Sequence, residues 1–589
     1  MGKEEYMEYY YTEEKNVQML VYLMKAHGIK RVIASPGTTN VTFVASIQQD
    51  PYFEIYSAAD ERSAAYMACG LAAESGEPVA LSCTGATASR NYLPGLTEAF
   101  YRKLPVLAIT STQHTGRIGQ LCPQVIDRSV IQKDVAVMSV QIPLIHSEED
   151  EWDCNVKLNT ALLALSHRSG GPVHINLTTN YSRDFDIKKL PDFRVIRRII
   201  SENGFPEITA NRVGIFVGAH AVWSQELTSA VDDFCEKYNG TVFCDHTSNY
   251  HGKYRVQFNL VTSQYKHYFE TRKMDLLIDM GEMSGAYMGL SPKEVWRVNP
   301  DGQIRDTWKK ITYIFDMKEV TFFRKYVALN ESEQIKTMYY DECKQEYDML
   351  CEKMPELPFS NDWVAKTTAP RLPKNSILHL GILNSLRSWN FYEIPETVTC
   401  FCNTGGFGID GIISTLVGSA LASPERLHFC VVGDLAFFYD LNAIANHNVR
   451  NNIRILLINN GCGAEFKNYS HFAAQFGDMA NEFMAAMGHY GQKSSNLVKH
   501  YSTDLGFEYL CASDKEEYLE NIDRFICPEL TDKPMLFEVF TNYQDESDAL
   551  KLINHIIEDP PSTTDRVKTV AKGILGDKCV KTLKRIVKG

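Results

Sequence analysis

The chain has 589 residues, of which 44% are hydrophobic and 23% charged, a composition typical of folded globular proteins. Lys and Arg number 60 against 73 for Asp and Glu, so the net charge is −13. Proteins that bind phosphate backbones by releasing counterions carry the opposite sign, and nucleic acid is therefore excluded as an expected partner. No run of about 18 apolar residues occurs, which disfavours a transmembrane segment.

The cysteines and the first residues of the chain indicate the expected compartment. The 15 cysteines show no paired C-x-x-C spacing of the kind that holds zinc, which favours reduced, mostly buried thiols. The first residues lack a basic start followed by an apolar core, so they do not resemble a secretion signal. We therefore expect a cytoplasmic protein.

Helical and β-rich segments alternate in the first third of the chain. Helices are expected over 16–26, 61–74 and 88–101, and strands over 31–35, 78–83, 105–110 and 173–177. Such alternation predicts parallel sheets with helical crossovers, that is, an α/β fold in a doubly wound arrangement. A polar, basic stretch at 188–198 is typical of a linker.

Two further series of the same kind follow. The second has expected strands at 213–217, 241–244, 276–280 and 311–315, then a charged, helical stretch at 331–356. The third has expected strands at 377–380, 398–402, 427–432, 453–458 and 535–539. We therefore predict three doubly wound parallel-sheet domains at 1–185, 186–355 and 356–545, followed by a basic tail at 546–589.

The end of the tail is amphipathic. Beyond residue 560 it is basic, and its apolar residues recur at near-helical spacing. A helix packed on its own domain is favoured over docking to a membrane surface or a partner.

A glycine pattern in the third series has two interpretations. The string GFGIDG at 406–411 follows a predicted strand, and Asp434 ends a later strand, as in sites for dinucleotide pyrophosphates. By this pattern alone a nicotinamide or flavin oxidoreductase remains open. The second interpretation uses the neighbouring strand ends.

Oxygen-bearing side chains follow two neighbouring strands of the third series. One strand ends in Gly433-Asp434, and the next ends in Asn459-Asn460-Gly461-Cys462-Gly463. Open α/β sheets bind ligands at these carboxyl ends, and a carboxylate, an amide oxygen and a backbone carbonyl suit Mg²⁺. Glycines there let the backbone approach a diphosphate. Each strand end alone is equally compatible with a helix cap or a turn.

Glu61 is the corresponding candidate in the first series. It opens a helix whose other face is small and apolar, in the string AADERSAAYMACGLA. A first-turn position favoured by the helix dipole accounts for an isolated glutamate equally well.

Together these features resemble thiamine-diphosphate enzymes of the decarboxylase and acetohydroxyacid-synthase superfamily. Within it the chain is most similar to the menaquinone-pathway family of 2-succinyl-5-enolpyruvyl-6-hydroxy-3-cyclohexene-1-carboxylate synthases, over nearly all of 14–545. The strings that carry the resemblance are SPGTTN at 35–40, DER at 60–62, GIDGIIST at 408–415, GDLAFFYDLNA at 433–443 and INNGCG at 458–463.

The resemblance implies a pyrimidine-binding, a middle and a diphosphate-binding domain, in that order. It makes Glu61 the acid that hydrogen-bonds the cofactor's aminopyrimidine, so we expect burial to raise its pKa. It makes Asp434, Asn460 and the Cys462 carbonyl the Mg²⁺ ligands. The remaining implied cofactor contacts are Gly408, Ile409, Gly433, Leu435, Ala436 and Gly463, with Ile409 as the bulky residue that bends the cofactor.

In this superfamily Glu61 and Asp434 meet at one cofactor from two subunits. The resemblance therefore implies a homodimer, or a homotetramer, with active sites at the subunit interface. Some relatives bind a flavin in the middle domain, but the string GIFVGAH at 214–220 also occurs in relatives without one, so FAD is not predicted.

The chain departs from the synthase family at its substrate arginines. Thr39 and Thr404 stand where that family has arginine, and Arg387 does not clearly match a third, although Ser385 matches the family serine. A polyanionic acceptor would lose charge-assisted hydrogen bonds worth about 1.5–3 kcal/mol each, which argues against isochorismate.

Other side chains are candidates for holding the substrate. Gln124 matches the family glutamine, and His114 follows the expected strand at 105–110, so both are candidate catalytic residues. Gln113 lies beside His114, and Arg117 is the local candidate for a keto-acid carboxylate. A solvated surface position is the alternative for His114 and Arg117.

We therefore predict an enzyme that uses thiamine diphosphate and Mg²⁺ to decarboxylate a 2-keto acid. Transfer of the acyl carbanion to an acceptor carbonyl is favoured over simple release of an aldehyde. The oxidoreductase and a catalytically silent scaffold protein stay as alternatives, although intact Glu61, Asp434 and Asn460 argue against the latter.

Overall fold

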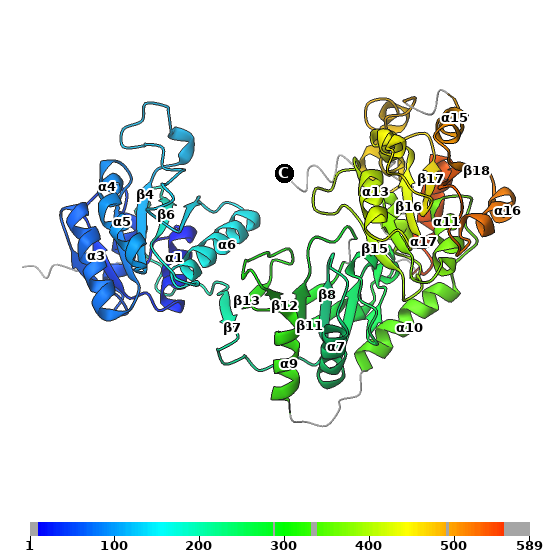
Figure 1. Ribbon diagram of the computed structural model, residues 1–589. Coiled ribbons are helices and arrows are strands. Elements are labelled where there is room, and N and C mark those ends of the chain that lie inside the picture. Colours follow the sequence, from blue (N-terminus) through cyan, green and yellow to red (C-terminus); the bar gives the residue numbers. More distant parts are fainter. Residues whose placement is uncertain (1–9, 287–288, 331–337, 490–493, 559–589) are drawn as a thin grey trace, which may run out of the picture. The chain divides into compact units, whose positions relative to one another are not determined.

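Three sheets, all built from parallel strands, form the framework of the protein, which confirms the α/β fold class (Figure 1). The computed structural model describes residues 10–286, 289–330, 338–489 and 494–558. The chain divides into two units, of which unit 1 is Met1–Phe205 with Pro300–Asp316, and unit 2 is Pro206–Asn299 with Met317–Gly589. The predicted boundaries at 185, 355 and 545 stay predictions.

Unit 1 contains a six-stranded sheet in the order β2-β1-β3-β4-β6-β5. Its strands are β1 (Arg31–Ala34), β2 (Glu54–Ser57), β3 (Val79–Thr84), β4 (Val106–Thr112), β5 (Met138–Ile142) and β6 (Val173–Thr178). Its helices are α1 (Lys15–Ala26), α2 (Val41–Gln48), α3 (Glu61–Ser75), α4 (Thr87–Asn91), α5 (Leu93–Arg102), the short η1 (Thr115–Arg117) and α6 (Glu148–Ala164). Two more strands of this unit, β7 (Arg197–Ile200) and β13 (Ile311–Asp316), pair with each other in parallel.

Both faces of this sheet are covered, as a doubly wound fold requires. On one face α1, α2 and α6 bury side chains such as Leu20 and Leu158. On the other face α3 and α5 pack small residues such as Ala65 against the sheet. The approach of these two helices requires a glycine, because a Cβ at Gly95 would lie 2.4 Å from the Cβ of Ala65.

Unit 2 contains the two other series of elements. Its middle part has β8 (Val213–Val217), β9 (Gly240–Cys244), β10 (Arg255–Val256), β11 (Lys273–Met280) and β12 (Ser291–Asn299), in the order β10-β9-β8-β11-β12. The accompanying helices are α7 (Gln225–Tyr238), η2 (His246–Ser248), α8 (Asn259–Thr262), η3 (Glu270–Arg272), α9 (Glu319–Leu329) and α10 (Met338–Glu352).

The last sheet has the order β15-β14-β16-β17-β19-β18. Its strands are β14 (Ile377–Leu380), β15 (Thr399–Phe401), β16 (His428–Gly433), β17 (Ile453–Asn459), β18 (Glu508–Ala512) and β19 (Met535–Phe540). The helices are α11 (Asn361–Thr368), η4 (Ala369–Arg371), α12 (Asn384–Trp389), α13 (Ile412–Ala422), α14 (Asp434–Tyr439), η5 (Leu441–Ala445), η6 (Ala464–Lys467), η7 (Phe472–Ala480), α15 (Leu497–Asp504), α16 (Lys515–Phe525) and α17 (Tyr543–Asn554).

Several element boundaries differ from the sequence prediction. The helix expected over 88–101 is two helices, α4 and α5, which meet at Tyr92. Pro94 stands in the first turn of α5, where its missing N–H is tolerated, whereas one continuous helix would need that donor. The predicted tail begins inside α17, and its amphipathic part, after residue 558, lies outside the described residues.

The described helices include none that is long and apolar enough to cross a membrane. Among the described cysteines all are free thiols, as the sequence predicts.

Candidate active site

Glu61 stands at the start of α3 because the residue before it caps the helix. The Asp60 side chain accepts a hydrogen bond of 2.7 Å from the Ser63 backbone N–H, an N-cap that fixes where the helix begins. Asn91 Nδ2 donates to Glu61 Oε2 at 3.3 Å, and the Glu61 side chain is only half-buried within unit 1. Full burial of the Glu61 carboxyl group would have to come from a ligand or from a protein surface outside this unit. The predicted desolvation of Glu61 therefore stays a prediction.

The other candidates in unit 1 lie on the loop that follows β4. His114 is exposed, and its Nδ1 accepts from the Gly116 backbone N–H at 3.0 Å. Arg117 is exposed and donates from Nη1 to the side-chain oxygen of Gln113. Gln124 is exposed too and has a φ of 65°, in the left-handed region. The catalytic roles of His114 and Gln124 stay predictions.

The two threonines at the family's arginine positions are buried and uncharged. Thr39 is 1% exposed, and its hydroxyl donates to the Ser111 carbonyl at 2.8 Å. Thr404 is 5% exposed. Neither position supplies a cation to a substrate.

Arg128 is a buried cation that the sequence analysis did not single out. It is 5% exposed, its Nη2 donates to Asn176 Oδ1 at 2.5 Å, and its Nε and Nη1 have no hydrogen-bond partner. Burial lowers its pKa to about 10. Its guanidinium lies against the turn after β3, where a Cβ at Gly85 would approach Nη2 to 2.7 Å. A buried arginine with two unsatisfied nitrogens suits a carboxylate ligand.

Arg128 lies in the same part of unit 1 as Glu61. Both charges act on the thiol of Cys83, where Arg128 lowers the pKa and Glu61 raises it, although burial dominates and raises the pKa to about 12. In the sequence, the available signal for Arg128 was its position four residues after Gln124, in the string QVIDRS.

In unit 2 the carboxylate of Asp434 is held at the end of β16. Its Oδ1 accepts from the Leu435 backbone N–H at 2.9 Å, and the Gly461 backbone N–H also donates to the carboxylate. Asp434 is 5% exposed, and burial raises its pKa to about 7. Because β16 and β17 pair in parallel with Gly433 opposite Ile458, their carboxyl ends lie side by side, as predicted.

The turn after β17 completes this group, called here the cradle (Asp434, Asn460 and Cys462). Asn460 Oδ1 accepts from the Cys462 backbone N–H at 3.3 Å, across Gly461 with a φ of 78°. The Cys462 carbonyl accepts from the Ala464 N–H at 3.0 Å and keeps a second lone pair. The Cys462 thiol also experiences the Asp434 charge, so the two residues are close.

The other cofactor-binding candidates of unit 2 lie in the segments after β16 and β17 and in the loop before α13. A Cβ at Gly463 would lie 3.4 Å from Leu435 Cδ1, so the chain segments after β16 and β17 touch there. Ile409 packs against the core cluster that contains Ala436. Gly408 lies in the loop before α13. Their contacts with a cofactor stay predictions.

The cradle fits a hard divalent cation. A buried carboxylate without a counter-charge is unfavourable, and in the described part of the chain no Lys, Arg or His forms an ion pair with Asp434. One carboxylate, one amide oxygen and one carbonyl leave positions open for water and phosphate oxygens, as Mg²⁺ prefers. No group of three or more acidic, His or Cys side chains that could hold a metal occurs among the described residues, and this ligand set needs only one acid.

Further buried acids lie near the cradle and were not anticipated. Glu538 accepts from Asn459 Nδ2 at 2.7 Å and raises the pKa of Asp434 further. Glu546 interacts with Asn460, and burial raises the pKa of Glu546 to about 8. A cation in the cradle would favour the charged forms of these acids, whose pKa values burial raises.

The sheet order argues against the dinucleotide interpretation of the GFGIDG string. That arrangement needs the strand before the glycines to pair with the strand that carries the acid. Here β15 precedes the glycines and β16 precedes Asp434, and β14 separates them in the sheet.

The comparisons with known proteins agree with this geometry. Residues 15–136 match the family described as "Thiamine pyrophosphate enzyme, N-terminal TPP binding domain". The chain is 32% identical over 567 residues to the 2-succinyl-5-enolpyruvyl-6-hydroxy-3-cyclohexene-1-carboxylate synthase of Bacteroides fragilis, covering 92% of this chain and 99% of that protein. It is 30% identical to the synthase of the same name from Bacteroides thetaiotaomicron, with the same coverage.

A further synthase of that name, from Flavobacterium johnsoniae, is 27% identical over 89% of this chain and 95% of its own length. These similarities confirm the resemblance drawn from the sequence strings. The chain is an enzyme that belongs to the thiamine pyrophosphate family, within the branch that contains these synthases.

Proposed function

We propose that this protein uses thiamine diphosphate and Mg²⁺ to decarboxylate a 2-keto acid and to transfer the acyl carbanion to an acceptor carbonyl. The observation that carries the proposal is the buried Asp434 carboxylate, which two backbone amides hold beside Asn460 and the Cys462 carbonyl. These three residues would hold Mg²⁺, and the metal would hold the cofactor's diphosphate. At Gly433 an added Cβ would meet nothing within 4 Å, so this position leaves room for that diphosphate.

Glu61 is the proposed proton donor to the aminopyrimidine. When bound, thiamine diphosphate supplies a thiazolium carbon that adds to the keto carbon and accepts the electron pair released with CO₂. Glu61 would hold its proton against a ring nitrogen and so raise the basicity of the amino group opposite. Asn91, which hydrogen-bonds Glu61 Oε2, would orient the carboxyl group.

The active unit is proposed to be a homodimer in which Glu61 and Asp434 at one cofactor come from different subunits. The family resemblance and the partial exposure of Glu61 within unit 1 support this. Mixing E61Q and D434N chains tests it, because a mixed dimer regains one intact site of its two. With random assortment about a quarter of wild-type activity returns, whereas none returns if both residues act within one chain.

The keto acid is proposed to be held by Arg128, with Gln124 and His114 from the loop after β4 facing the reacting atoms. Arg128 is the buried cation of unit 1 with unsatisfied nitrogens. The relatives' name describes a cyclohexene carboxylate product. Because Thr39 and Thr404 supply no charge here, the proposed acceptor carries fewer carboxylates than isochorismate.

Simple decarboxylation is the second candidate, since loss of arginines also suits an enzyme without an acceptor. Pyruvate or 2-oxoglutarate is incubated with the loaded enzyme, with and without candidate carbonyl acceptors, and products are followed by mass. A carbon–carbon adduct that requires the acceptor supports the proposal, and an aldehyde in its place supports the decarboxylase. Absence of bound thiamine diphosphate and of CO₂ release across a keto-acid panel contradicts both.

A further inference from the structure

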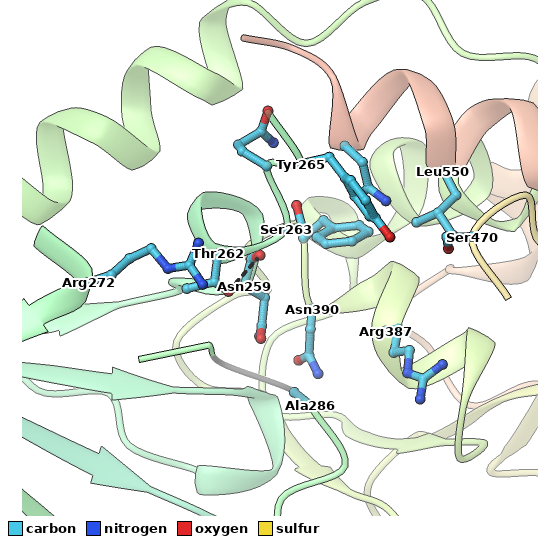
Figure 2. A pocket seen from close by; sticks show the side chains of 13 residues that line it. Asn259, Thr262, Ser263, Tyr265, Arg272, Ala286, Arg387, Asn390, Ser470 and Leu550 are labelled. Atoms are coloured by element: carbon cyan, nitrogen blue, oxygen red, sulfur yellow. Dashed lines mark hydrogen bonds between the residues drawn. The ribbon is translucent and has the colours of Figure 1, made fainter. Parts of the chain in front are cut away.

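Unit 2 contains a cavity of about 500 Å³, lined by residues outside the cradle (Figure 2). Its walls come from α8 and the segment after it, from η3, from α12 and from α17. None of the residues that form the cradle lines it. This size is in the range of small-molecule sites.

Three asparagines that line the cavity carry buried amide atoms with no hydrogen-bond partner. These atoms are Asn259 Nδ2, Asn390 Nδ2 and Asn554 Oδ1, and the three residues are 6%, 0% and 7% exposed. Figure 2 shows the amide groups of Asn259 and Asn390 directed toward the space beside Ala286. Buried polar groups in folded proteins are almost always satisfied, so three such atoms around one cavity indicate a missing partner.

The orientation of Asn390 follows from its other contacts. Its Oδ1 accepts from the His246 backbone N–H at 3.0 Å and from Gln257 Nε2 at 3.3 Å. The oxygen must face these donors, so Nδ2 is the free end and can only donate. A ligand there must offer an acceptor oxygen.

The charge of the lining favours an anion. The lining includes Arg272 and Arg387 and no acidic residue. Arg272 donates from Nε and Nη2 to the Gly289 carbonyl and stacks on Tyr268, with Cζ 4.5 Å from the ring centre. Arg387 pairs with Glu465, which is not in the lining. Guanidinium groups held in this way are suited to carboxylates and phosphates.

We propose that this cavity binds a small organic anion that carries a carboxylate or phosphate and at least one hydroxyl group. The anionic oxygens accept from Asn259, Asn390 and the two arginines, and the hydroxyl donates to Asn554 Oδ1. The site does not depend on the proposed function, because it shares no residue with the cradle or with the candidates of unit 1.

Isothermal titration calorimetry of the full chain, without thiamine diphosphate, tests the proposal. Citrate probes carboxylates, glucose 6-phosphate probes phosphate, and glucose is the uncharged control. We expect saturable binding of at least one anion and no measurable binding of glucose. The double variant R272Q/R387Q should weaken binding by about tenfold or more, since it removes two charge-assisted donors.

Two variants separate loss of the site from loss of the fold. S470W adds a bulky ring at an exposed lining residue while both arginines stay, and it should abolish binding. R324Q removes an arginine that pairs with Glu226 on the surface of the same unit, and it should bind as the wild type does. The proposal is overturned if neither anion binds, if glucose binds as tightly, or if S470W and R272Q/R387Q bind unchanged.

Discussion

The candidate groups of unit 1 and unit 2 differ in how completely their own unit encloses them. In unit 2 the Asp434 carboxylate and Cys462 are buried, and the ligands of the proposed cation lie at adjacent strand ends. In unit 1 Glu61 is half-buried, while His114 and Gln124 are exposed. Unit 2 thus encloses the proposed Mg²⁺ ligands by itself, whereas unit 1 leaves the proposed catalytic residues exposed or half-buried.

The roles proposed for the two groups account for this difference in burial. A cation site must be arranged before the ion binds, because repulsion and desolvation are otherwise too costly. An acid that works against a bound ring needs the ring itself to exclude water, so it stays accessible until the cofactor arrives. The variants below separate these two demands.

E61Q should have the largest effect. The amide cannot deliver a proton to the ring, so kcat should fall by roughly 10²–10⁴-fold, the usual contribution of a positioned acid. Affinity for Mg²⁺ and thiamine diphosphate should change little, because the cradle lies in unit 2. Steady-state kinetics with cofactor titration measures both quantities, and unchanged turnover would remove Glu61 from the mechanism.

D434N should show the opposite pattern. Replacing the carboxylate that balances the cation should lower Mg²⁺-dependent cofactor affinity by about 100-fold or more, since a charged ligand is lost. Calorimetric titration of Mg²⁺ and thiamine diphosphate measures this. D532N changes an exposed acid of the same unit and is the matched control. Equal affinity in D434N and D532N would contradict the metal cradle.

The cradle was predictable from sequence, whereas Arg128 in unit 1 was not. Asp434 and Asn460 each follow a buried, β-rich run, and parallel pairing brings the ends of such runs together. Arg128 follows an irregular loop after η1, where no periodicity shows which side chains turn inward. Its burial depends on Gly85 and Asn176, which are distant in the sequence.

The same contrast holds for the fold. The central strands were predicted within one to three residues, because burial on both faces gives continuous apolar runs. The edge strands β2, β5 and β18 were missed, since their exposed or half-buried, mixed composition carries no such signal. β12 was missed because it begins with Ser291-Pro292 and polar residues, although its second half is buried.

R128Q tests the surface of unit 1. If Arg128 holds the keto-acid carboxylate, its loss should raise KM by roughly 10–100-fold, as expected for a charge-assisted hydrogen bond. R117Q is the comparison variant and should raise KM less, because Arg117 is exposed and already donates to Gln113. A shift in KM with an unchanged melting temperature supports substrate binding. A lower melting temperature with unchanged KM shows a structural role.

D362N should have the smallest effect, and that effect depends on pH. Asp362 in α11 is 2% exposed, and burial raises its pKa to about 7 from an ordinary value of 3.8. The folded state therefore holds a proton that the unfolded chain has lost, so stability falls as pH rises from about 4 to about 7. Asparagine does not titrate, and D362N should match the wild type near pH 4 and melt a few degrees higher above pH 7.

Thermal unfolding of wild type, D362N and the exposed D532N at both pH values measures this difference. Because Asp362 hydrogen-bonds Ser388, the amide can keep that contact while it removes the buried charge. A constant offset between D362N and wild type at both pH values would mean that Asp362 does not titrate in this range. A gain confined to high pH would place part of the pH sensitivity of the apoprotein in the buried acids of unit 2, where burial raises the pKa of Asp434 and Glu546 as well.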